Sequence, residues 1–111
     1  MMIEKIVIDY LNKNLDVPVY AEHQRTDPRS FVLVERVGSA RNNLINRASL
    51  AIQSYAESMV EAAELNEKVK SAMYEIVKLD EIGSCKLDSD YNYTDTETKQ
   101  YRYQAIFDIY F

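Results

Sequence analysis

The sequence has few of the residues on which many catalytic and extracellular proteins depend. Its 111 residues include one cysteine, Cys85, one histidine, His23, and no tryptophan. A single cysteine excludes an internal disulfide and a cysteine-rich zinc site, and it is compatible with a reducing compartment. Two glycines are too few to build a loop that cradles phosphate groups with its backbone.

Basic residues are also scarce. Thirteen Lys and Arg residues stand against eighteen Asp and Glu residues, which gives a net charge of −5. Proteins that bind nucleic acid gain much of their affinity from clustered Lys and Arg side chains, because these displace counterions from the phosphates. The charge balance therefore disfavours non-specific binding of DNA or RNA.

Long apolar runs are missing from the beginning of the chain. The segment MMIEKIVIDYLNKNL is interrupted by Glu4, Lys5 and Asp9, so it lacks the apolar region of a signal peptide and the length of a membrane span. We therefore expect no membrane association and a cytoplasmic origin. The hydrophobic fraction of 47% is that of a globular protein, and the length predicts one domain over residues 1–111.

The first half of the chain predicts a helix followed by three strands. Apolar residues recur at helical spacing and the helix should end near Asn14; they are Met2, Ile3, Ile6, Val7, Tyr10 and Leu11. The segment VPVYAE predicts a short edge strand because of Pro18. FVLVERVG predicts a strand covered on both sides in its first half, SARNN a turn, and LINRASLAIQSYA a strand with alternating faces.

The second half predicts a helix and a long hairpin. Ser58 and Glu61 have the spacing of a capping box, and the helix should cover residues 59–78. Its apolar stripe is Ala62, Leu65, Val69, Ala72, Met73 and Ile76, while Glu64, Glu67, Lys68 and Lys70 should face solvent. Strands over residues 85–93 and 100–111 should flank a loop at 94–99. The order predicts one α+β domain, with an antiparallel or mixed sheet of four to five strands packed by two helices.

Tyrosines in the hairpin leave two interpretations open. Tyr101 and Tyr103 alternate in phase with Phe107 and Ile109, which favours a packed layer. The alternative is a stacking platform for single-stranded nucleic acid, formed by Tyr91, Tyr93, Tyr101 and Tyr103.

Two groups of residues could form a metal site or a catalytic pair, and each can also be explained without a function. The first positions of a calcium-binding loop are matched by Asp88, Asp90 and Asn92, but Tyr93 and Lys99 occupy the positions of the required Gly and Glu. We therefore expect the three side chains to line one solvated face of a strand. Cys85 and His23 are the only candidates for a nucleophile and its base, and nothing in the sequence brings them together. We expect no enzymatic activity, no metal and no cofactor, and a small hydrolase built on Cys85 is the alternative.

Charged residues mark three candidate interaction segments. Arg36, Arg41 and Arg47 gather around the predicted turn, either as a solvated hairpin end or as a surface that binds carboxylates of a neighbouring copy. Two polar loops should contact partners, because each projects from strands that hold its base rigid. Their candidate contact residues are His23, Arg25, Asp27 and Arg29 in one loop and Thr94, Asp95, Glu97 and Lys99 in the other.

Three segments together resemble the small tail terminator proteins of long-tailed bacteriophages and prophages, also called tail-to-head joining or tail completion proteins. In that family a strand near FVxVER and a glycine precede an Arg-containing loop and a strand ending near VQxWA. A capped helix with EAExL and a terminal hairpin containing RYQ follow. The matching positions are 31–38, 48–58, 61–65 and 101–104. Tyr55 stands where Trp is common in the family.

The resemblance implies a structural role in virion assembly. Such proteins form rings, commonly hexameric, that bind the head-proximal end of the tail tube, stop its growth and join the head connector. The implied partners are other copies of the chain, the tail-tube protein and the connector, in the virion tail and earlier in the host cytoplasm. DNA would pass through the ring without specific binding. Exposed ion pairs are weak, which predicts a monomer in dilute solution; a head-closure subunit is the alternative role.

Overall fold

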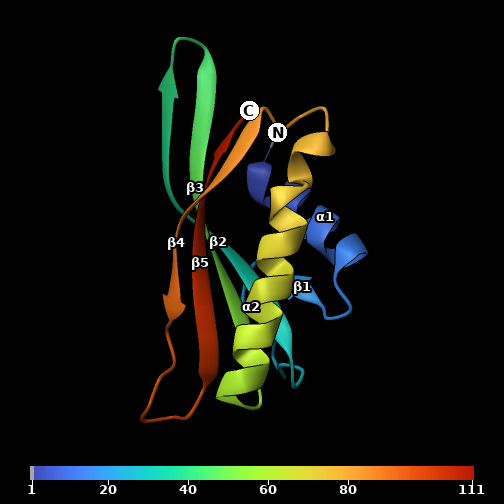
Figure 1. The fold of residues 1–111 in the computed structure, drawn as a ribbon, viewed down its shortest axis with the longest axis vertical. Helices are drawn as coiled ribbons and strands as arrows, with labels where there is room; N and C mark the ends of the chain where they lie inside the picture. Colours follow the sequence, from blue (N-terminus) through green and yellow to red (C-terminus); the bar gives the residue numbers. More distant parts are fainter. Residues whose placement is uncertain (1) are drawn as a thin grey trace.

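A computed structural model describes residues 2–111 as a five-stranded mixed sheet with two α-helices on one face (Figure 1). The strand order is β1-β2-β3-β5-β4, which confirms the α+β prediction. The elements are α1 (Ile3–Asn14), β1 (Val19–Tyr20), β2 (Phe31–Asn42), β3 (Ile45–Ala56), α2 (Met59–Tyr74), the 3-10 helix η1 (Ile76–Lys78), β4 (Ser84–Asn92) and β5 (Tyr101–Tyr110). Neither α-helix in the described chain is long and apolar enough to cross a membrane.

The first helix is fixed to the edge of the sheet by its polar face as well as its apolar one. Ile3, Val7 and Leu11 are fully buried, as the helical spacing predicts. The side chain of Asn12 then imitates a strand: its Nδ2 donates to the carbonyl of Val19, and its Oδ1 accepts from the N–H of the same residue. The short strand β1 is thereby held parallel to β2 at the predicted edge.

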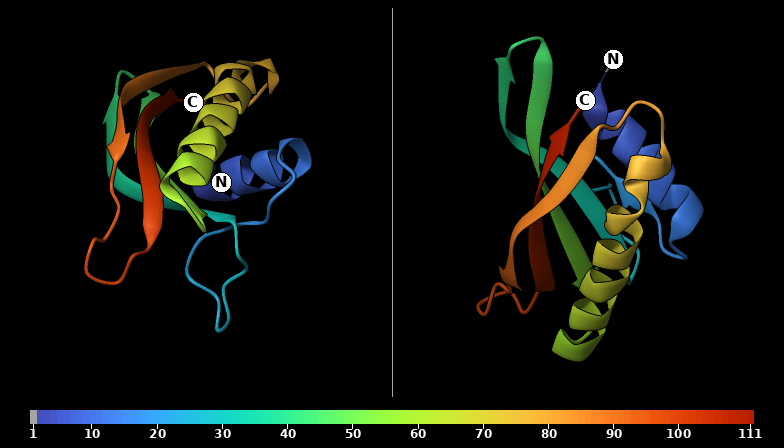
Figure 2. Two further views of the ribbon diagram at one scale, coloured as in Figure 1. Left: turned by 60° about the horizontal axis from the view of Figure 1, so that its bottom comes forward. Right: turned by 45° about the horizontal axis from the view of Figure 1, so that its top comes forward.

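The second helix covers the inner face of the sheet, where its apolar stripe meets β3 and β5 (Figure 2). The Oγ of Ser58 accepts a hydrogen bond of 3.2 Å from the N–H of Glu61 and caps the helix as predicted. Val69 and Met73 are fully buried in one cluster with Ile52 and Phe107. The α-helix ends at Tyr74, before the predicted residue 78, and η1 completes the segment.

The side chains of Lys70 and Asp90 are half-buried between α2 and β4 and do not lie on the predicted solvated faces. The Nζ of Lys70 contacts the Oδ2 of Asp90 at 3.0 Å, and Asn66 donates to the same oxygen at 2.9 Å. A register shift between Leu87 and Ser89 takes Asp88 out of the alternation, so Asp90 turns toward α2. Hydrogen bonds that Lys70 donates to Glu67 and to Asp90 raise the pKa of its amine. The prediction of one solvated face for the Asp88, Asp90 and Asn92 side chains was therefore wrong.

The hairpin between β2 and β3 is longer than the sequence predicts. The segment expected to form a turn, SARNN, continues β2 as far as Asn42, and the real turn is only Asn43 and Leu44. Both have positive φ, 50° and 67°, the sign that a two-residue hairpin turn requires. Asparagine adopts that geometry readily and leucine does not, so the sequence did not show that the turn is at these two residues. For Leu44 the left-handed backbone costs about 1–2 kcal/mol.

The sheet has a second, smaller apolar cluster on the face away from the helices. Phe31, Leu33 and Tyr55 are buried there, with Tyr20 packed against them. The first four residues of β2 are therefore covered on both sides, as the uninterrupted apolar run predicts. This outer cluster lies at one end of the sheet, and the β2–β3 turn lies at the other (Figure 1).

We expect Val69→Asp to unfold the domain. Val69 is fully buried, and an unpaired charge in a core costs several kcal/mol, about as much as the net stability of a domain this size. The matched control is Val60→Asp on the same helix, where Val60 is 66% exposed and near the helix start, so that a carboxylate is tolerated. Thermal unfolding followed by circular dichroism measures both. A Val69→Asp protein that melts like the parent would show that this helix face is not core.

Candidate functional site

The two polar loops that the sequence singled out lie at the same end of the molecule. Residues 21–30 precede β2, and residues 93–100 connect β4 to β5; both project beyond the sheet beside the start of α2 (Figure 2). We call this part of the surface the loop end. Strand pairing explains the arrangement, because Phe31 pairs with Tyr55 and Tyr55 pairs with Arg102, so the strands that carry both loops finish at the same level.

Tyr55 connects one loop to the other. Its ring stacks on Phe31 with 4.5 Å between centroids and meets the His23 ring edge to face at 5.3 Å. Its hydroxyl lies 3.4 Å from the Nε2 of His23 and accepts a hydrogen bond of 3.0 Å from the Nη1 of Arg102. Arg102 also stacks over Tyr93, 4.4 Å from the ring centroid. A single buried phenol therefore sets the position of the two loops relative to each other.

The first loop is closed by a hydrogen bond between His23 and Asp27. The His23 Nδ1 and the Asp27 Oδ2 lie 2.7 Å apart, and the other carboxylate oxygen accepts from the N–H of Gln24 at 2.7 Å. The hydrogen bond with His23 lowers the pKa of Asp27 below its usual value of 3.8. Arg29 pairs with Glu57 at 3.1 Å but keeps 89% of its side chain exposed, and Arg25 is exposed as well.

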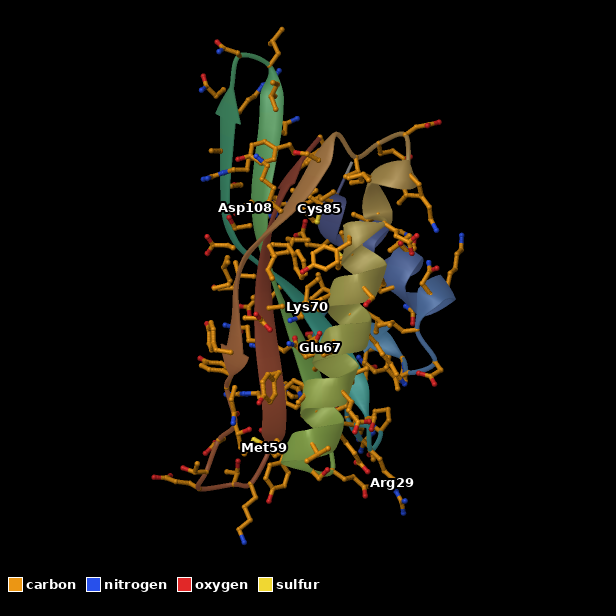
Figure 3. The ribbon with its side chains drawn as sticks, in the orientation of Figure 1. Arg29, Met59, Glu67, Lys70, Cys85 and Asp108 are labelled. Atoms are coloured by element: carbon orange, nitrogen blue, oxygen red, sulfur yellow. The ribbon has the colours of Figure 1, made fainter. Side chains whose placement is uncertain are left out.

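The hairpin loop is ordered by its own side chains. Asp95 Oδ1 accepts from the N–H of Glu97 at 3.0 Å, and the hydrogen bond from the Thr98 side chain leads the causes that lower the pKa of Asp95. Thr94 Oγ1 donates to the carbonyl of Arg102 at 3.3 Å. At the base of the loop, Asn92 Nδ2 approaches the sulfur of Met59 at 2.7 Å, which ties the hairpin to the start of α2 (Figure 3). Glu97 and Lys99 remain exposed.

From Tyr55 a chain of hydrogen bonds crosses the outer face of the sheet. Tyr55 donates to Gln53 at 3.1 Å, Gln53 to Gln104 at 2.7 Å, and Gln104 to the hydroxyl of Tyr91 at 2.6 Å. Tyr55 and Gln53 are two residues apart on β3, whereas Gln53, Gln104 and Tyr91 are direct neighbours across β3, β5 and β4. These hydrogen bonds connect Tyr55 at the loop end with Tyr91 on the edge strand β4.

The three arginines lie toward the opposite end, away from the loops. All three line one shallow depression, but the register puts Arg36 and Arg41 on the helix side of the hairpin and Arg47 on the other side. Arg36 is paired with Glu4 of α1. Arg41 is exposed. The sequence thus grouped residues that share a hairpin but not a face.

Two alternatives fail on geometry. Tyr101 and Tyr103 pair with Ala56 and Ser54 and so share the inner face with Phe107, as predicted, whereas Tyr91 is bonded on the outer face. The four tyrosines therefore cannot form one stacking surface.

Cys85 and His23 are the other pair that the fold keeps apart. Cys85 pairs with Ile109, while His23 lies beside the Tyr55–Arg102 level, roughly 24 Å further along β5. Burial raises the pKa of the Cys85 thiol to about 11, and the Asp108 charge adds to this effect.

Sequence reasoning missed Gln53, Tyr55, Arg102 and Gln104 at the loop end, and it considered Tyr91 only as part of a stacking platform. Their link depends on the register between β3, β5 and β4, for which the sequence has no signal of its own. No protein-family model matches the chain, and no curated protein matches it. Assignment of a role therefore depends on the geometry of the loop end and on the sequence resemblance.

We expect Asp27 to titrate below pH 3.8. Because the folded pKa is lowered, the His23–Asp27 contact is fully formed above the unfolded pKa and is lost as the pH falls through the folded one. Carboxyl chemical shifts of Asp27, followed by NMR against pH, measure the midpoint. His23→Ala should return it toward 3.8; an unchanged midpoint in that variant would show that His23 is not the cause.

We expect Cys85 to react slowly with iodoacetamide. With a pKa of about 11, its thiolate fraction at pH 8 is roughly 100-fold or more below that of an unperturbed cysteine. The reference is the same chain unfolded in guanidinium chloride, with alkylation followed by mass spectrometry. Reaction as fast in the native protein as in the unfolded chain would reopen a nucleophilic role for Cys85.

Proposed function

We propose that the chain is a structural subunit of a phage or prophage tail, which forms a ring at the head-proximal end of the tail tube, stops tube growth and joins tail to head. The family resemblance of three sequence segments suggests this role, and the geometry of the loop end supports it. The proposal makes the chain a binding subunit and not an enzyme.

The connection through Tyr55 is the observation that carries the proposal. Two polar loops, separated by more than sixty residues in the sequence, are held against one phenol by His23 and Arg102. Loops fixed in this way lose little conformational entropy when they meet another protein, so more of the contact energy remains as affinity. Functional contacts concentrate on loops that a rigid scaffold positions.

The shape of the subunit supports a role between two different neighbours. The principal extents are 44 × 25 × 25 Å, with the loop end at one extreme of the sheet and the β2–β3 hairpin toward the other (Figure 1). A growing tube presents the same unsatisfied interface after each added layer. A ring that complements this interface on one side only would stop the stacking.

The acidic charge suits a channel for DNA. A net charge of −5 per subunit gives phosphate groups little to bind, so DNA could move through the ring without being retained. A head-closure subunit would have the same property and would differ only in its neighbours.

We expect the protein to shorten tail tubes assembled from purified tube subunits and to sit at their ends. The test variant replaces residues 96–99, which form the exposed tip between Asp95 and Gln100, with Asn-Gly, a pair suited to a two-residue hairpin turn. It should retain the melting temperature and lose capping. Electron microscopy measures tube length and end occupancy.

The matched control alters the first helix. Lys5→Ala with Asp9→Ala removes an exposed ion pair of α1 that lies outside both loops, leaves the net charge unchanged and should cap tubes as well as the parent. Tubes that grow on regardless, with bare ends, would refute the tail role, and selective binding to connector rings would identify a head-closure subunit.

A further inference from the structure

The β2–β3 hairpin projects past the rest of the sheet. Asn46 and Phe111 exchange two backbone hydrogen bonds of 3.1 and 2.9 Å. Beyond their level β3 pairs only with β2 in the described structure, so the end of the hairpin is a two-stranded ribbon. Two apolar side chains on it are exposed, Ile45 at 53% and Leu44 at 82%. We call residues 41–47 the tip; a ribbon of this kind gains little stability alone.

Leu44 is the unusual residue of the tip. Its backbone is left-handed, with φ 67°, a conformation that glycine and asparagine adopt more readily. Its side chain is not part of the core. Unfavourable backbone geometry combined with an exposed leucine points to a function outside the isolated chain. A side chain at the apex of a protruding ribbon is well placed to enter a cavity on another molecule.

The tip and the stretch before it also differ in charge from the rest of the chain. Residues 36–49 contain Arg36, Arg41 and Arg47 and no acidic residue, a charge of +3. The whole chain carries −5, so the remainder carries −8. Such an asymmetry favours contact between the hairpin of one copy and an acidic surface of another.

An acidic groove of suitable character lies on the helix side of the loop end. It has a volume of about 360 Å³ and an apolar floor formed by Val17 and Leu65. Its walls carry four acidic and two basic side chains: Asp16, Glu57, Glu61, Glu64, Arg29 and Lys68. Arg29 is already paired with Glu57, so the other charged side chains of the groove are three acidic residues, Asp16, Glu61 and Glu64, and one basic residue, Lys68.

We propose that the tip of one copy docks in this groove on the next copy, with Leu44 on the apolar floor and Arg41 against the acidic walls. The contact rests on the proposed function in one respect, namely that a ring requires a contact between subunits. The residues that form it are argued without reference to a tail tube. Burying a leucine and pairing charges at its rim are the two features that interface centres and rims ordinarily combine.

The contact is head to tail. The tip and the groove lie toward opposite ends of a molecule that is 44 Å long (Figures 1 and 3), so a chain cannot fill its own groove. Two different surfaces of the same chain then meet, which generates a ring if the rotation between copies closes.

The first variant, Leu44→Gly, separates assembly from stability. Glycine relieves the left-handed strain, and removal of an exposed side chain costs no core contact, so the melting temperature should rise by about 2–5 °C. Self-association at low ionic strength, measured by sedimentation over a concentration series, should weaken by about tenfold or more. A variant that is more stable and associates as strongly as the parent would overturn the role of Leu44.

The second variant inactivates the groove and leaves the tip intact. Asp16→Lys with Glu64→Lys changes two exposed wall residues and should weaken self-association to a similar degree. Glu22→Lys with Glu97→Lys is its control, because it changes the net charge equally at exposed positions outside the groove. Equal loss in the control would reduce the effect to overall charge and refute the groove.

The decisive measurement mixes the two variants. The Leu44→Gly chain has an intact groove and the groove variant an intact tip, so the mixture should form a one-to-one dimer although each variant alone is monomeric. A mixture that stays monomeric while the parent associates would refute the contact, as would a parent that does not associate at any concentration. Tube capping by a parent without this contact would leave the tail role standing, and association without capping would leave the contact standing.

Discussion

The packing of α2 on the inner face of β3 and β5 is the interaction on which the rest of the molecule depends. Val69 and Met73 close over Ile52 and Phe107, and this fixes which side of every strand faces the helices. With the inner side settled, the other side of β3 must present Gln53 and Tyr55 outward in register with β5. The geometry of the loop end therefore depends on apolar burial on the opposite face of the sheet.

The elements that follow from periodicity could be predicted from the sequence. The stripe on α2 and the alternation of Tyr103, Phe107 and Ile109 gave the helix face and the strand face without reference to any partner. Lys70 and Asp90 could not be placed in this way. The inward orientation of Asp90 depends on the register shift after Leu87, and Lys70 pairs with the carboxylate that this shift places there. A one-residue shift leaves no mark in composition or spacing.

The candidate site was predicted in its parts and missed in its connection. Polar loops around Asp27 and Asp95 were recognisable from their turn residues. The phenol that joins them was not, because Tyr55 becomes a neighbour of Arg102 only after β3 and β5 pair. The position of the β2–β3 turn was missed for a different reason. The turn contains Leu44 at a position with positive φ, where glycine is expected, and sequence alone cannot distinguish such a strained turn from the middle of a strand.

The two register shifts in the sheet also bear on how the protein behaves when many copies are made at once. One lies on β2 between Arg36 and Gly38 and the other on β4 between Leu87 and Ser89, so each of the two outermost long strands carries an irregularity. Kinked borders with charged side chains pair poorly with a second sheet. Open-ended, amyloid-like stacking of sheet on sheet is thereby discouraged.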